Sequence, residues 1–156
     1  MDFITDGAQY LPAALTSENL ERLEQILSAV PAGRPGNRLS GIPALSEFLS
    51  VDGAVGCLAA PILGLDAKPV RALLFNKTAA QNWALGWHQD RTIAVRERSE
   101  APGFANWTVK SGLLHVEPPF DLLERMITLR IHLDPVGLGN APLLIVPRSH
   151  SLGRIP

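Results

Sequence analysis

The sequence predicts a mainly β fold with helices at its N-terminal end, and three observations support this prediction. Gly and Pro, 13 of each, make up one residue in six of the 156, a proportion typical of many short strands joined by turns. Apolar residues at helical spacing lie mostly in the first third, whereas β-favouring runs begin near residue 68. A chain of this length is most simply one domain. We therefore expect a single domain over residues 1–156, with a helical part at 1–67 and a sandwich-like or barrel-like sheet at 68–156.

The clearest helix is expected over residues 16–30. Its apolar side chains recur at i, i+3 and i+4, and Thr16 or Ser17 can accept hydrogen bonds from the first free backbone N–H groups. The run PAGRPGN, residues 31–37, ends this helix because Pro and Gly interrupt helices. Weaker helical pieces are expected over residues 42–62.

The remainder contains short runs rich in β-branched and aromatic residues, several of them separated by Pro, Gly or Asn. One helical interruption is expected at PPFDLLERM, where prolines precede an apolar i, i+3, i+4 pattern. The runs predict an antiparallel sheet, and they cover residues 70–76, 83–95, 107–118, 126–136 and 142–150.

Composition excludes several functional classes. With a formal net charge of −1 and no basic run, the chain has nothing to attract nucleic acid or an anionic membrane. The apolar stretches are too short and too rich in Gly and Pro to span a bilayer, and the N-terminus does not resemble a secretory signal. The single cysteine, Cys57, cannot form an internal disulfide, and we expect it to be buried among apolar residues. These features predict a cytoplasmic protein.

The run GWHQDRTIAV holds the most suggestive polar pair. In an extended strand His88 and Asp90, at i and i+2, point to the same face while Gln89 points away. One imidazole and one carboxylate are two of the three ligands of a facial triad, which leaves positions on an iron ion open. The spacing alone also fits a solvated strand that carries two polar residues, so both interpretations stay open at this point.

Longer strings in the same region resemble bacterial members of the phytanoyl-CoA dioxygenase family, from about Leu73 to the end of the sequence. They are LLFNKTAAQNWALGWHQDRTIAV, PGFANWTVKSGLLHVEPP, LERMITLRIHLDPVG and NAPLLIVPRSHSLGRI. The resemblance implies a double-stranded β-helix (a cupin-like jelly roll) that uses Fe(II), 2-oxoglutarate and O2 to oxidise small organic substrates. It assigns His88 and Asp90 to the first two iron ligands.

The same resemblance implies a fold that is incomplete at its C-terminal end. In the family the turn matched by residues 147–150 is a loop element, and the distal histidine and an arginine that anchors 2-oxoglutarate come later, beyond Pro156 here. Three explanations follow: a fragment of a longer enzyme, a short relative that has lost catalysis, or a site that another histidine completes.

The run at residues 128–134 contains the candidates for that third explanation. Its period of two places Arg130 and His132 on one face. His132 is either a substitute metal ligand or, as we favour, a histidine bonded to a backbone carbonyl behind the site. Arg130 needs an anion, either 2-oxoglutarate or an acidic side chain such as Asp134 or Glu124. By resemblance, Arg130 and Leu73 line the 2-oxoglutarate pocket.

The other histidines and the tryptophans have plainer interpretations. We expect His115 to be a core or surface histidine rather than a substrate contact, and His150 to fix a turn with its neighbour Ser149. The tryptophans are expected in the core or in a pocket wall, and they are Trp83, Trp87 and Trp107.

Three functional classes are therefore carried forward. The first is an Fe(II)/2-oxoglutarate-dependent dioxygenase with His88 and Asp90 as metal ligands. The alternative is a non-catalytic cupin-like binding domain without a complete metal site. A hydrolase with another metal at His88, Asp90 and His132 is third. An incomplete sheet exposes unpaired edges, so we also expect a homodimer that covers them.

Overall fold

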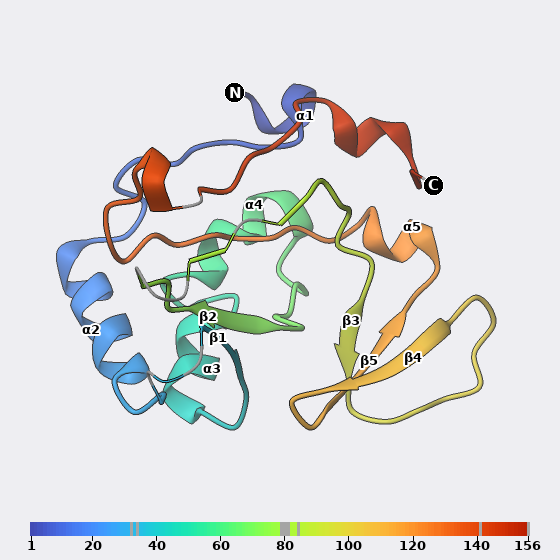
Figure 1. Ribbon diagram of the computed structural model, residues 1–156, viewed down its shortest axis with the longest axis horizontal. Helices are drawn as coiled ribbons and strands as arrows, with labels where there is room; N and C mark the ends of the chain where they lie inside the picture. The colour runs from blue at the N-terminus through green and yellow to red at the C-terminus, as the bar shows by residue number, and fades with distance from the viewer. Residues whose placement is uncertain (32, 34, 79–81, 84, 141, 156) are drawn as a thin grey trace.

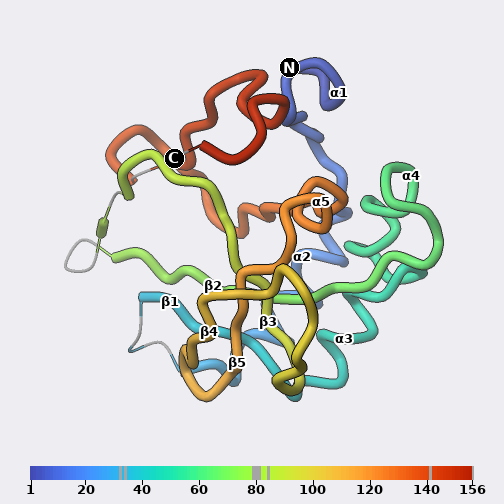
Figure 2. Tube along the Cα trace, turned by 90° about the vertical axis from the view of Figure 1, so that its right-hand side faces the viewer, coloured from blue at the N-terminus to red at the C-terminus, as the bar shows by residue number. Residues whose placement is uncertain are grey.

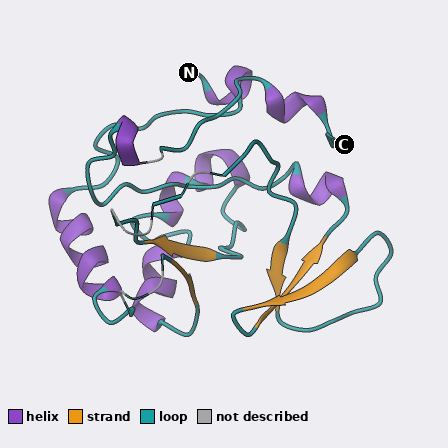
Figure 3. Cartoon of the chain, viewed as in Figure 1, coloured by secondary structure: helices purple, strands orange, loops and turns teal. Residues whose placement is uncertain are grey.

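The computed structural model describes residues 1–31, 33, 35–78, 82–83, 85–140 and 142–155. It is a mixed structure, in which helices gather around a two-stranded sheet and a separate three-stranded sheet projects to one side (Figure 1). Long connections without regular structure link these elements (Figure 3). The predicted N-terminal helices and antiparallel strands are confirmed, whereas the two small sheets of the described chain do not confirm the predicted jelly roll.

The main N-terminal helix lies within the predicted range 16–30 but ends at Leu27, and the sequence did not predict the short helix α1, Phe3–Asp6. Helix α2, Ser17–Leu27, begins at Thr16, whose side chain accepts a 3.2 Å hydrogen bond from the backbone N–H of Asn19. Three short helical elements follow the Pro- and Gly-rich break. They are α3 (Pro43–Leu49), the 3₁₀ turn η1 (Gly56–Leu58) and α4 (Ala60–Leu63).

The core forms where α2 meets α3. Its buried side chains are Leu23, Leu45, Phe48 and Val55. Leu129, Ile131 and Leu133 pack against these from the 128–134 run, as does Ala72 from a strand. The core therefore contains side chains from both the predicted helical part and the predicted sheet part.

A strand also forms within the part expected to be helical. Strand β1, Gly36–Leu39, pairs antiparallel with β2, Ala72–Phe75, in the register Arg38 opposite Leu73. Alternation places Ala72 against the core and Leu73 on the opposite face. The sequence did not predict this strand within the helical part at 1–67, because a four-residue strand leaves too weak a periodic signal and depends on its distant partner.

The three-stranded sheet has the order β3–β5–β4 and is antiparallel throughout. Its strands are β3 (Ile93–Val95), β4 (Ala105–Lys110) and β5 (Leu113–Glu117). The predicted run 107–118 is thus a hairpin. Ser111 and Gly112 turn it with φ of 53° and 77°, the positive values that a tight hairpin turn requires.

Three predicted strands differ from expectation. Only Ile93–Val95 of the run 83–95 is a strand; Ala84 in that run lies outside the described residues. Within the described chain, the runs 126–136 and 142–150 contain no strand. The period of two is nevertheless correct for residues 128–134, because Leu129, Ile131 and Leu133 face the core. Alternation fixes which side chains are buried, but a strand also needs a hydrogen-bonding partner.

The two ends of the described chain lie side by side. Helix α1, Phe3–Asp6, contacts the segment that contains the 3₁₀ turn η3, Ser149–Leu152, as both views show (Figures 1 and 2). The remaining short elements are α5 (Phe120–Leu123), at the predicted PPFDLLERM interruption, and η2 (Leu138–Asn140). Among the described residues, no helix has the length and apolar character needed to cross a membrane.

Candidate metal site

His88 and Asp90 lie in a loop, residues 86–91, that leads into β3; we call it the His-Asp loop. The prediction that they sit on a strand is wrong, since β3 begins only at Ile93. Both residues are exposed, whereas Gln89 between them is partly buried. Exposed and partly buried side chains therefore alternate in the loop as they would in a strand. His88 and Asp90 lie on one side and Gln89 on the other, as the sequence predicts.

The ring of His88 is held by a local hydrogen bond. Its Nδ1 lies 2.8 Å from the carbonyl oxygen of Gly86. A carbonyl oxygen can only accept, so Nδ1 carries the proton and the neutral ring keeps a lone pair on Nε2. A histidine that binds a metal usually donates its other ring N–H in this way, which fixes the tautomer and the ring orientation.

The carboxylate of Asp90 has a cationic neighbour. Arg71, which precedes β2, places Nη2 3.7 Å from Asp90 Oδ2, and its Nη1 is 3.5 Å from the Thr92 carbonyl oxygen. The Asp90 side chain is 65% exposed and that of Arg71 21%. An ion pair this long and this exposed contributes little stability, so Asp90 is accessible to a cation.

The opposite side of the His-Asp loop makes firmer contacts. Gln89 Nε2 donates to the Gly153 carbonyl oxygen at 2.8 Å, and the Ile155 N–H donates to Gln89 Oε1 at 3.0 Å. Arg91 Nη2 donates to the Ile155 carbonyl oxygen and lies 3.4 Å from Gln89 Oε1. One side of the loop thus holds residues 153–155, and the other presents His88 and Asp90.

Arg130 and His132 form a separate pair. Both are exposed, and Arg130 Nε donates to His132 Nε2 at 3.3 Å. His132 is therefore bonded to a side chain rather than to a backbone carbonyl, which differs from the interpretation favoured above. Within the described residues, Arg130 makes no ion pair with Asp134 or Glu124, and no hydrogen bond or ion pair joins this pair to the His-Asp loop.

The other histidines have structural surroundings. His115, on the central strand β5, is fully buried; its Nδ1 bonds the Leu113 carbonyl oxygen at 2.8 Å, and its Nε2 has no partner among the described residues. His115 is thus a core histidine, one of the two expected alternatives. His150 Nε2 lies 3.2 Å from the Ile4 carbonyl oxygen, so it attaches η3 to α1 in addition to lying in a turn.

Two expectations of burial are wrong. Trp87 is 70% exposed in the His-Asp loop, and Cys57 is exposed in η1. Both lie in short irregular elements, where no neighbouring layer covers an apolar side chain. Trp83 does pack as expected, with its ring centroid 5.9 Å from that of Phe75, and Trp107 is half-buried beside Arg98.

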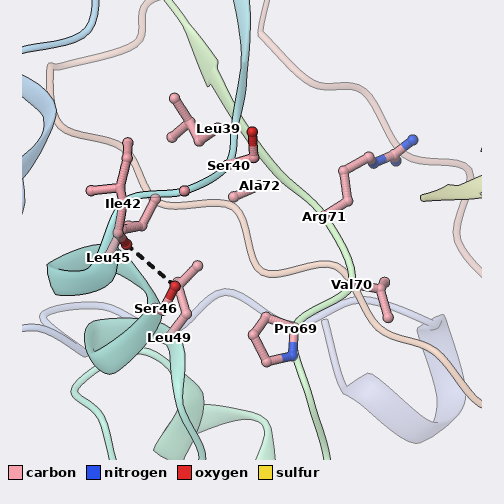
Figure 4. Close-up of a pocket in the computed structure, with 11 residues that line it drawn as sticks. Leu39, Ser40, Ile42, Leu45, Ser46, Leu49, Pro69, Val70, Arg71 and Ala72 are labelled. Carbon is pink, nitrogen blue, oxygen red and sulfur yellow. Dashed lines mark hydrogen bonds between the residues drawn. The ribbon is translucent and has the colours of Figure 1, made fainter. Parts of the chain in front are cut away.

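A small pocket of the described structure has no lining residue from the His-Asp loop. It has a volume of about 140 Å³ and lies between α3 and the β1–β2 sheet. Figure 4 shows its apolar wall, including Ile42, Leu45 and Pro69, and the Arg71 side chain extending away from it. Ligand pockets usually exceed about 300 Å³, so this one is too small for an ordinary organic substrate.

The donor set fits a metal ion only in part. His88 offers an oriented imidazole with a free Nε2, and Asp90 offers an accessible carboxylate. Among the described residues, however, no group of three His, Cys, Asp or Glu side chains is close enough to hold a metal ion. The described residues therefore supply two of the three ligands of a 2-His-1-carboxylate site, the imidazole of His88 and the carboxylate of Asp90.

Sequence reasoning missed the residues that surround this pair. Arg71 reaches Asp90 from a segment 19 positions away, and no local pattern predicts such a contact. For Gln89 the sequence did contain a signal, because the period of two places its side chain on the face opposite His88 and Asp90. The sequence did not show which groups Gln89 would bind on that face.

Comparison with known proteins gives one match. Residues 4–156 match the family model described as "Phytanoyl-CoA dioxygenase (PhyH)". The match extends the resemblance, seen in the sequence from Leu73 onward, through the N-terminal helices. No curated protein and no solved structure matches this chain.

Proposed function

Since the chain belongs to the phytanoyl-CoA dioxygenase family, we propose that it is an Fe(II)/2-oxoglutarate-dependent dioxygenase acting on a small organic substrate. The observation that carries the proposal is the His88–Asp90 pair. Both side chains are exposed, and the hydrogen bond to Gly86 leaves His88 Nε2 free to bind a metal.

In this proposal His88 Nε2 and the Asp90 carboxylate hold Fe(II), with a further histidine as the third ligand. Bound iron would supply oxidative chemistry coupled to decarboxylation of 2-oxoglutarate. The protein's own residues bind and orient: the Gly86 carbonyl oxygen fixes the His88 ring, and Arg71 lies beside Asp90. Neither His88 nor Asp90 transfers a proton here.

The finer description of the fold belongs to the same proposal. We assign β3, β4 and β5 to a double-stranded β-helix within a single domain over 1–156. The shared core supports one domain, because side chains from both sequence parts pack in it. Arg130 is proposed to contact 2-oxoglutarate, with Leu73 in the pocket wall; the support is that the Arg130 guanidinium makes no ion pair among the described residues. The cytoplasm is the proposed compartment.

One observation favours a second candidate, a non-catalytic cupin-like binding domain. Two donors hold iron weakly, and the described residues bring no third His, Cys, Asp or Glu to them. This domain would bind its ligand without metal and without consuming 2-oxoglutarate.

The test is anaerobic titration of the protein with Fe(II) and then 2-oxoglutarate, monitored by the metal-to-ligand charge-transfer absorption. We expect the band in the native protein and its loss in His88→Ala and Asp90→Asn. His132→Ala should keep the band if His132 is not a ligand. Loss of the band in His132→Ala would instead make it the third ligand.

A matched control accompanies these variants. Asp121→Asn removes a similarly exposed carboxylate that pairs with Arg125, and this variant should keep the band. A native protein that shows no band and consumes no 2-oxoglutarate would contradict the dioxygenase and support the binding domain.

A further inference from the structure

The loop that carries His88 and Asp90 is supported from behind by a segment far away in sequence, residues 148–155. The amide of Gln89 bonds this segment twice, donating to the Gly153 carbonyl oxygen at 2.8 Å and accepting from the Ile155 N–H at 3.0 Å. Arg91 adds a hydrogen bond to the Ile155 carbonyl oxygen. The Gln89 amide thus binds one backbone C=O and one backbone N–H, as a neighbouring β-strand would. Two hydrogen bonds from one amide fix the position of the segment relative to the loop.

The 148–155 segment is itself anchored to two other elements. Arg154 Nη2 is 2.9 Å from Glu117 Oε1 on β5, and Asn106 Nδ2 donates to the other oxygen of that carboxylate at 2.6 Å. The Glu117 side chain is only 15% exposed, so this contact is better shielded than a surface ion pair.

The second anchor lies on α1. The Arg148 N–H donates to the Asp6 carbonyl oxygen at 2.8 Å, and His150 Nε2 lies 3.2 Å from the Ile4 carbonyl oxygen. The segment therefore connects the His-Asp loop to α1 at one end and to the three-stranded sheet at the other, as the top of Figure 1 shows for its contact with α1.

We propose that Gln89 is a positioning residue for metal binding: it locks the His-Asp loop onto residues 153–155, so that His88 and Asp90 are held on the outer face. That the ligand is a metal ion rests on the proposed function. That Gln89 holds the loop rests only on its hydrogen bonds to residues 153–155. A loop without regular secondary structure needs such support, because a metal site requires its ligands to be held within fractions of an ångström.

Gln89→Glu tests the lock with almost no change in shape. The carboxylate can still accept from the Ile155 N–H, but it has no N–H to donate and would face the Gly153 carbonyl oxygen. We expect metal affinity, measured anaerobically with Co(II) by calorimetry, to fall about 10-fold or more, as for other residues behind metal ligands. Gln25→Glu is the matched control, because the exposed side chain of Gln25 makes no hydrogen bond in the described structure and its substitution should leave affinity unchanged.

A second readout does not depend on metal. Nitrogen NMR of the metal-free protein reports the His88 tautomer, and the native ring should carry its proton on Nδ1 because of Gly86. In Gln89→Glu we expect a mixture of tautomers at His88 and faster amide exchange at Ile155, with His115 unchanged.

The outcomes separate the two proposals. If the native protein binds Co(II) and Gln89→Glu binds it equally well with an unchanged His88 tautomer, the lock is overturned and the dioxygenase stands. If the native protein binds no metal, the dioxygenase fails, and the tautomer and exchange data alone decide the lock: changes at His88 and Ile155 support it, and their absence overturns it.

Discussion

Single residues decide how the ends of the described chain meet. Gly7 closes α1 with φ of 76°, and a Cβ built there would lie 2.3 Å from His150 Nδ1. The position therefore needs glycine for two reasons: the left-handed backbone, and the close approach of the imidazole that bonds Ile4.

Comparing Gly7→Ala with Gly41→Ala separates the cost of the left-handed backbone from the cost of the contact with His150. Gly41 also has a positive φ, 68°, but a Cβ added there would meet nothing within 4 Å, so alanine suffers only the backbone strain of about 1–2 kcal/mol. We expect Gly7→Ala to lower the free energy of unfolding by more than Gly41→Ala, as measured by urea denaturation. Equal losses would show that His150 moves aside without cost.

At the scale of elements, α1 depends on its capping carboxylate. Asp2 Oδ1 accepts from the Thr5 N–H at 2.9 Å, and this backbone hydrogen bond lowers the pKa of Asp2 from its ordinary value of 3.8. The ionised form is thus favoured in the folded state. Its stabilising contribution is present above pH 3.8 and is lost as the pH falls through the lowered pKa of the folded protein.

This linkage predicts that α1 loosens on acidification in that window. The Thr5 amide signal, followed by NMR from about pH 5 downward, should shift with a midpoint below 3.8. Asp2→Asn keeps an oxygen acceptor but does not titrate, so the shift should disappear in this variant. If the shift persists in Asp2→Asn, the Asp2 carboxyl does not cause it.

At the scale of the whole molecule, the main feature is apolar surface on an extended segment. Leu143, Leu144, Ile145 and Val146 are 52%, 65%, 45% and 46% exposed. Within the described residues, no strand pairs with them. Four consecutive exposed apolar residues that join no described strand can serve as a template for pairing with another chain.

The sequence predicted a homodimer that covers an exposed sheet edge, and we propose that the dimer forms through this segment. Light scattering at increasing concentration should show a rising mass, and Ile145→Lys should suppress the rise. Leu65→Lys is the control, because Leu65 is 78% exposed but lies in a turn. A constant monomeric mass in the native protein would rule the dimer out.

Local patterns in the sequence determined that a helix lies within residues 16–30 with its cap at Thr16 or Ser17, and they determined the faces of residues 128–134. They succeed because capping and periodicity act between residues a few positions apart. The exposure of His88 and Asp90 opposite Gln89 could be predicted for the same reason. The strand partner of β1, the ion pair of Asp90 with Arg71 and the hold of Gln89 on residues 153–155 were decided only by the tertiary structure. Each of these contacts joins segments 19 or more residues apart, and the chain's path between them, rather than any local preference, brings their polar groups within hydrogen-bonding distance.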